Sequence, residues 1–201
     1  MCASIPADSE LLQIVDAALA EAARRSGPWL PCRIGCTPCC HGVFAISQLD
    51  AQRLRAGMRE LASRDPRRAE NIRTRARASV AKLASGFPGD STTGLLAEGE
   101  AAEREFDDFA NDEPCPVLDS VSGACDLYDA RPMTCRAFGP AVRHASGEIS
   151  TCELCYSGAT GDQIASCAVA FETKELEPML IARAEAETGL RGNTIVAFCL
   201  A

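Results

Sequence analysis

The sequence has few of the residues and motifs on which common enzymes depend. It contains two histidines and one tryptophan, and aromatic residues make up 5% of its 201 positions. Scarce histidine narrows the choices for general acid–base chemistry near neutral pH. We find no Ser-His-Asp arrangement, phosphate-binding glycine loop, dinucleotide fingerprint or zinc-protease helix. The sequence therefore indicates no common catalytic class, and both an enzyme and a binding protein stay open.

Long apolar segments and an excess of positive charge are also absent. No stretch is apolar over the roughly 20 residues that a helix needs to cross a bilayer. Residues 1–10 lack the basic stretch and apolar run of a secretory signal, so we expect a cytoplasmic protein. The formal net charge is −8, and an acidic chain repels phosphate backbones. We therefore expect no membrane and no nucleic acid as a partner, while a protein partner stays open.

Length and hydrophobic content favour a single domain over residues 1–201. A chain of this length can bury a sizeable core, and 47% of its residues are hydrophobic. Apolar residues at helical spacing predict a helix over 9–25. A longer helix is predicted over 162–187, with a bend or break near Pro178. The motif core over 32–140 lies between these flanking helices.

Capping signals predict two helices inside the motif core. Ser47 followed by Asp50 resembles a capping box, so we expect a helix to about residue 62. Asp65-Pro66 is typical of an N-cap and a first-turn proline, and a second helix should follow to about residue 84. Both helices are rich in arginine, which favours solvated faces over a docking surface for an anionic partner.

The remaining segments are less regular. A third helix is predicted over 95–110, and prolines and glycines make 114–140 irregular. Residues 145–148 are typical of a turn that joins two short strands, and 194–200 predict a strand or a packed tail. The expected fold class is mainly α: a small helical domain with irregular, metal-stapled cysteine loops and a short hairpin.

Cysteine is the unusual component, with twelve residues. A reducing cytoplasm keeps thiols free, so such a density favours metal ligation or redox chemistry over disulfides. Buried cysteine can also serve as a small hydrophobic residue, but that suits isolated cysteines better than four within nine residues. Thiolates two or three residues apart on a turn can converge on one ion at about 2.3 Å. The run consists of Cys32, Cys36, Cys39 and Cys40.

Two further groups supply the other candidate ligands. Three cysteines lie ten residues apart in the irregular segment, and a CxxC pair follows them. Cys2 near the terminus, Cys167 on a helix and Cys199 in the tail are set aside. Two four-thiolate sites, or one polynuclear cluster with one mononuclear site, suit the nine that remain. The candidate metal ligands are Cys32, Cys36, Cys39, Cys40, Cys115, Cys125, Cys135, Cys152 and Cys155.

The two histidines add little to this set. His41 abuts the cysteine run, so it is either a ligand, a donor to a ligand, or a partly exposed loop residue. His144 is expected to be an ordinary loop residue.

The cysteine pattern and the residues around it resemble the YkgJ-like CxxCxxCC cysteine-cluster family. The run at 32–40 matches the first motif of that family. The second half is matched by Cys115-Pro116-Val117-Leu118, Cys125-Asp126-Leu127-Tyr128, Arg131-Pro132, Cys135-Arg136 and Phe138-Gly139. The family is described as zinc- or iron-chelating, so the resemblance implies metal or cluster binding through these seven cysteines.

Neighbouring side chains fit supporting roles beside thiolates. Four thiolates around a divalent ion leave a net charge of about −2, which cations offset. We expect Arg131 and Arg136 to supply such charge, with salt bridges to the acidic stretch as the simpler alternative. Tyr128 and Phe138 are expected to pack over the site and exclude water.

Three functions are compared. The first is a binding or structural protein that chelates a zinc or iron ion through its thiolates. The second is an iron–sulfur redox or radical-type enzyme, because Cys32-x3-Cys36-x2-Cys39 resembles the cluster motif of radical S-adenosylmethionine enzymes. The chain is too short for the barrel that usually presents that motif. The third is a thiol–disulfide catalyst using Cys152-x2-Cys155, although Gly158 and Gly161 interrupt the helix that should follow. We therefore predict metal binding without an assigned reaction.

Overall fold

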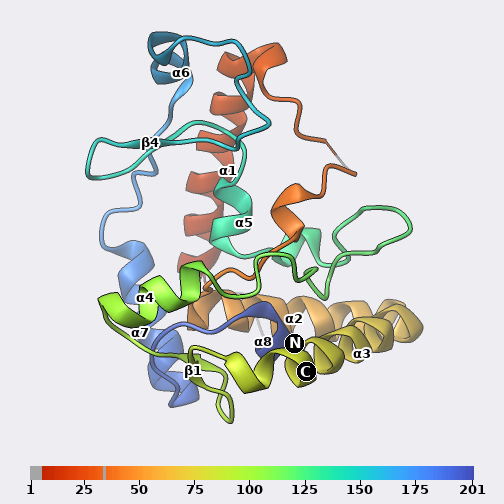
Figure 1. Ribbon diagram of the computed structural model, residues 1–201. Coiled ribbons are helices and arrows are strands. Elements are labelled where there is room, and N and C mark those ends of the chain that lie inside the picture. The colour runs from red at the N-terminus through yellow and green to blue at the C-terminus, as the bar shows by residue number, and fades with distance from the viewer. Residues whose placement is uncertain (1–5, 34) are drawn as a thin grey trace. The chain divides into compact units, whose positions relative to one another are not determined.

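The computed structural model describes residues 6–33 and 35–201 (Figure 1). Helices dominate this part of the chain, and its strands form two antiparallel hairpins of two strands each. The prediction of a mainly helical fold with a short hairpin is confirmed. No helix in the described ranges is long and apolar enough to span a membrane.

Contacts within the chain divide it into two compact units, each combining segments that are distant in sequence. Unit 1 contains the described residues 6–33 and 135–180, and unit 2 contains 35–134 and 181–201. The predicted motif core over 32–140 is thus divided between the two units. The expectation of one domain over 1–201 stays a prediction.

Unit 2 is built on a helical hairpin and a short C-terminal helix that pack together (Figure 1). These are α2 (Gln48–Arg64), α3 (Pro66–Leu83) and α8 (Val196–Leu200). Their apolar side chains form a buried core that includes Leu54 and Ile72. Burying one such side chain contributes about 1.5–3 kcal/mol. Apolar packing therefore holds the helical scaffold of unit 2 together.

Both predicted helix starts in this hairpin are confirmed. The Ser47 hydroxyl accepts a hydrogen bond from the backbone N–H of Asp50 at 3.2 Å. The Asp65 carboxylate accepts one from the backbone N–H of Arg68 at 3.0 Å, and proline occupies the first turn of α3. Each cap satisfies an N–H group that the helix leaves without a partner. Local sequence therefore suffices to define these boundaries.

The segment after α3 differs from the prediction of a helix over 95–110. The 3-10 turn η3 (Ala84–Gly86) is followed by a hairpin of β1 (Gly89–Asp90) and β2 (Leu95–Leu96), and α4 (Glu100–Asp107) comes after it. The predicted start is wrong because Leu95 pairs with Asp90, and Leu96 donates its N–H to Asn193 O at 2.9 Å. Strand pairing thus replaces the first turn of the predicted helix.

Unit 1 centres on α1 (Pro6–Ser26), which confirms the helix predicted over 9–25. The 3-10 turn η1 (Gly27–Trp29) follows α1, and α6 (Gly161–Cys167) packs against α1 (Figure 1). A buried Ser26–Tyr156 hydroxyl pair at 2.6 Å ties the end of α1 to a later segment of the unit.

A second hairpin lies in unit 1. Strands β3 (Val142–Arg143) and β4 (Ile149–Ser150) pair antiparallel, with Val142 opposite Ser150. This confirms the turn predicted at 145–148. The Tyr156 hydroxyl also accepts a hydrogen bond from the backbone N–H of Ala141 at 2.9 Å, which fixes the entry to β3.

The helix predicted over 162–187, with a bend or break near Pro178, is interrupted earlier than predicted. The chain forms α6 and then α7 (Leu176–Thr188), with an extended stretch between them. Val169 in that stretch pairs in parallel with Val142 of unit 1. Pro178 does not break a helix, because it lies in the first turn of α7, where a residue without a backbone N–H removes no intrahelical hydrogen bond.

Two short helices were not predicted. The 3-10 turn η4 (Tyr128–Ala130) and α5 (Met133–Ala137) occupy the segment predicted to be irregular. At 194–200 the strand alternative is wrong and the packed tail is confirmed, because α8 is helical and its Val196 and Cys199 are buried.

Candidate metal centre

The 3-10 turn η2 (Pro38–Cys40) presents two adjacent thiols of unit 2. Its backbone closes through the N–H of Cys40, which donates to Thr37 O at 2.7 Å. Pro38 pre-sets φ at the first position of the turn. The thiols of Cys39 and Cys40 lie close enough to form a hydrogen bond with each other.

Two more thiols reach this turn from the irregular segment after α4. The N–H of Cys115 donates to Cys40 O at 2.8 Å, which joins the two cysteine segments. Ten residues later the chain has reversed, so that Leu118 pairs with Cys125 in an isolated antiparallel bridge. The spacing of ten residues therefore places both cysteines on the two arms of one tight turn.

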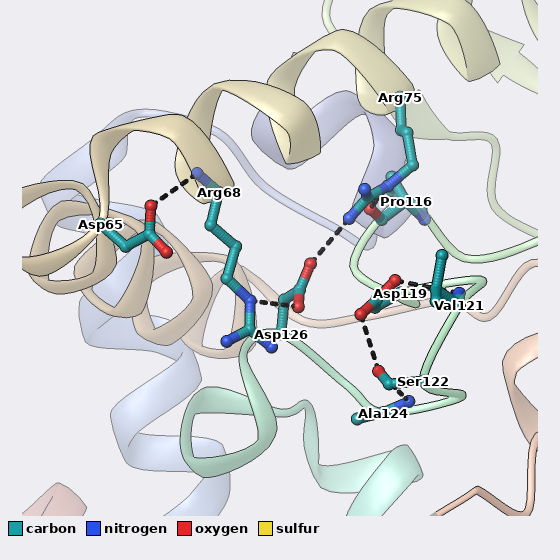
Figure 2. A network of polar contacts seen from close by, with 9 residues as sticks. All are labelled: Asp65, Arg68, Arg75, Pro116, Asp119, Val121, Ser122, Ala124 and Asp126. Carbon is teal, nitrogen blue, oxygen red and sulfur yellow. Dashed lines mark hydrogen bonds and ion pairs between the residues drawn. The ribbon is translucent and has the colours of Figure 1, made fainter.

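The tip of that turn lies beside the segment that carries Cys36. The Asp119 carboxylate accepts hydrogen bonds from Val121 N at 3.0 Å and from the Ser122 hydroxyl, which shape the tip (Figure 2). Gly123 has a φ of +68°, and a Cβ there would lie 3.1 Å from Gly35 Cα. A side chain at this position would push the tip away from the Cys36 segment.

The four thiols of unit 2 perturb one another electrostatically. A hydrogen bond from the Cys40 thiol lowers the pKa of Cys39 to about 6. The pKa of Cys40 is raised, first by that hydrogen bond, then by burial and by the charges of Cys39, Cys115 and Cys125. Burial raises the pKa of Cys115 to about 12 and also raises that of Cys125. Four thiolates held this close repel one another, and a bound cation relieves that repulsion.

Helix α3 holds both arms of the cysteine turn. Arg75 donates from Nε to Pro116 O at 2.7 Å and from Nη2 to the Asp126 carboxylate at 2.8 Å (Figure 2). Arg68 donates from Nε to the other carboxylate oxygen at 2.6 Å. The Asp126 side chain is only 2% exposed. Both of the arginines that pair with its charge come from α3. Sequence reasoning missed these residues, because no sequence pattern distinguishes the two arginines that bond to Asp126 from the others.

Unit 1 carries a separate group of thiols. The sulfurs of Cys32 and Cys155 lie 3.8 Å apart. The N–H of Cys155 donates to Cys152 O at 2.9 Å, so the CxxC pair forms a turn. Burial, followed by contact with the Cys32 thiol, raises the pKa of Cys155 to about 12.

Cys135 belongs to the same unit and lies on α5, partly buried. The guanidinium of the next residue, Arg136, is buried and donates to the Asp16 carboxylate of α1 at 2.8 Å. Arg131 belongs to unit 2, and its positive charge acts on the Cys125 thiol. That charge lowers the pKa of Cys125, although burial raises it by more.

The aromatic residues do not support the covering role predicted for them. Tyr128 is 56% exposed, and the guanidinium of Arg131 lies 3.9 Å from its ring centroid. Phe138 is 41% exposed. The histidines are also exposed: His41 pairs with Pro114 in an isolated bridge, and His144 hydrogen-bonds Ser150 within the second hairpin at 2.8 Å.

The nine candidate ligands fall into two sets according to unit. Throughout the described ranges, the cysteines are free thiols, and Cys2 lies outside those ranges. No three Cys, His, Asp or Glu side chains among the described residues are already placed to hold one ion together. Unit 2 holds Cys36, Cys39, Cys40, Cys115 and Cys125, whereas unit 1 holds Cys32, Cys135, Cys152 and Cys155.

The donor chemistry of both sets fits zinc or iron. Thiolate sulfur is a soft ligand that these metals accept, and four such donors complete a closed tetrahedral site. One pair of sulfurs in each set is close together: Cys32 and Cys155 lie 3.8 Å apart in unit 1, and Cys39 and Cys40 are hydrogen-bonded in unit 2. Joint coordination needs rotation about the short cysteine side chains, which pass between staggered rotamers at little cost.

Comparison with known proteins agrees with this chemistry. Residues 31–155 match the sequence model of the CxxCxxCC family, which is described as "Putative zinc- or iron-chelating domain". No curated protein and no solved structure matches the chain. The matched range covers more than half of the chain and contains all nine candidate ligands. The chain therefore belongs to the CxxCxxCC family.

Proposed function

We propose that this protein binds zinc or iron through cysteine thiolates. One observation carries the proposal: the segments that bear Cys39 and Cys40 and those that bear Cys115 and Cys125 are distant in sequence, yet Cys115 N–H bonds to Cys40 O at 2.8 Å and Cys125 lies on the other arm of the same turn. An apolar core needs no such gathering of ionisable sulfurs, whereas a thiolate centre does.

The division of cysteines between the units supports two centres. The first would use ligands from the unit 2 set, and the second those from the unit 1 set. The four thiols of unit 1 are the number that a closed tetrahedral site needs. Unit 2 has five, which is one more than such a site needs. Free thiols throughout the described ranges suit a reducing compartment, which supports the expectation of a cytoplasmic protein.

Bound metal would stabilise the cysteine-bearing loops more than the helices. Helices α2, α3 and α8 share an apolar core, whereas the cysteine segments 35–42 and 114–126 contain no helix beyond the 3-10 turn η2 and join each other through backbone hydrogen bonds such as Cys115 N–H to Cys40 O. Bound metal supplies a cross-link between these segments, and its binding free energy adds to their stability. The protein's own residues position the sulfurs and offset their charge, as Arg75 and Arg131 do in unit 2.

Anaerobic purification followed by elemental analysis tests the proposal. We expect zinc or iron in a fixed ratio to protein, and loss of that metal to a strong chelator. The variants Cys167→Ser and Cys199→Ser are matched controls, because both thiols are buried and donate to backbone carbonyls of Arg25 and Ala51. Metal retained in these controls supports the proposal, whereas the absence of stoichiometric metal from the unaltered protein contradicts it.

The absorption spectrum of the same sample distinguishes the forms of metal. Thiolates suit a zinc ion, an iron ion and an iron–sulfur cluster alike. A colourless protein with stoichiometric zinc indicates a structural or binding centre. A brown protein with absorption in the visible range indicates an iron–sulfur cluster and favours the redox alternative.

A further inference from the structure

Helix α3 contacts the residue that directly follows each of two cysteines in the turn. Pro116 follows Cys115 directly, and Asp126 follows Cys125 directly. Arg75 bonds to both followers at once, to the carbonyl oxygen of Pro116 at 2.7 Å and to the carboxylate of Asp126 at 2.8 Å. A single guanidinium therefore sets the separation of the two chain segments at the residue after each cysteine (Figure 2).

The Asp126 carboxylate is paired with two arginines of α3. The Asp126 side chain is 2% exposed, and its two oxygens accept from different arginines, Arg68 and Arg75. A buried carboxylate in this position is stable only while its charge is paired. The pairing thus ties the arm that carries Cys125 to the rigid helix, and the Pro116 bond ties the arm that carries Cys115.

Resting on the proposed function, we propose that Arg75 is a positioning residue for the unit 2 metal centre: held by Asp126, it fixes the Cys115 and Cys125 arms at the separation that metal binding requires. The guanidinium also brings positive charge near the Cys115 sulfur. Lysine cannot replace it fully, because one ammonium group cannot span two acceptors in the fixed geometry of a guanidinium.

The test compares zinc affinity in four variants of the full chain. Arg75→Gln removes the charge and the fork, Arg75→Lys keeps the charge alone, and Asp126→Asn weakens the anchor. Glu70→Gln is the matched control, since Glu70 lies on the same helix and pairs with Arg73 and Arg77 instead of Arg68 or Arg75. Affinity is measured by competition with a chromophoric chelator, and cobalt substitution reports thiolate coordination through its charge-transfer absorption.

We expect Arg75→Gln and Asp126→Asn to lower zinc affinity at unit 2 by roughly 10- to 100-fold, the usual effect of losing a group that orients a ligand. Arg75→Lys should recover part of the loss, and Glu70→Gln should match the unaltered protein. A weaker cobalt–thiolate absorption in Arg75→Gln, with the helical circular dichroism of the metal-free protein unchanged, separates positioning from general unfolding.

Two outcomes overturn the proposal in distinguishable ways. Unchanged affinity in both Arg75→Gln and Asp126→Asn, with the unaltered protein loaded, overturns the positioning role alone. An equal loss in Glu70→Gln does the same, because the effect then belongs to the helix as a whole. An unaltered protein that takes up no zinc, cobalt or iron overturns the proposed function and this role together.

Discussion

Replacing Gly139 with alanine is expected to lower the metal content of unit 1 while unit 2 stays loaded. A Cβ on Gly139 would lie 2.9 Å from the Cys32 sulfur. Ordinary contact begins at 3.4 Å, so the sulfur has to move by at least the difference, 0.5 Å. The Cβ takes up space that the Cys32 side chain uses, so we expect Cys32 to reach a metal position less readily and unit 1 to hold less metal.

Gly147 provides the matched control within the same unit. Its φ of +88° is also left-handed, as is the +119° of Gly139, but a Cβ there would meet nothing within 4 Å. Both alanine variants should therefore lose about 1–3 kcal/mol of unfolding free energy from backbone strain, measured by urea denaturation without metal. Elemental analysis should then show less metal in Gly139→Ala alone, and equal metal content in the two variants would refute the reasoning.

Three further outcomes are expected. In the metal-free chain at pH 7, iodoacetamide should label Cys39 faster than Cys199, because a hydrogen bond lowers the pKa of Cys39 to about 6 whereas burial raises that of Cys199 to about 11. Labelling of Cys39 should slow as the pH falls through about 6, when the thiolate is protonated; equal rates by mass spectrometry argue against this. Ser47→Ala should lower the unfolding free energy by about 1 kcal/mol, because the α2 cap is lost. An unchanged urea midpoint would show that this cap does not stabilise the protein. Hydrogen peroxide should join Cys32 and Cys155 in a disulfide, each thiol losing one hydrogen as the peroxide is reduced to two waters, because their sulfurs are 3.8 Å apart; peptide mapping that finds both thiols free after oxidation would exclude it.

Features encoded by neighbouring residues were predictable from the sequence. The caps at Ser47 and Asp65 were identified because each acts on an N–H three residues away. Features that depend on distant partners were not. The helix predicted over 162–187 is interrupted earlier than predicted because Val169 pairs with Val142, and the helix over 95–110 failed at its start because Leu95 pairs with Asp90.

The same distinction applies to the candidate site. The cysteine spacing identified nine candidate ligands, and their role as ligands stays a prediction. Their division was not predictable, because Cys32 and Cys36 are four residues apart yet belong to different units. The role of Arg75 was hidden among many arginines, since only the folded chain shows which of them faces Pro116 and Asp126.

The most direct test of two thiolate centres is anaerobic metal analysis of one serine variant in each unit. Cys115→Ser removes a candidate ligand from unit 2, and Cys155→Ser removes one from unit 1. The account predicts that each variant loses the metal of its own unit and keeps that of the other. Metal content unchanged in both variants, or abolished entirely by either one, would contradict it.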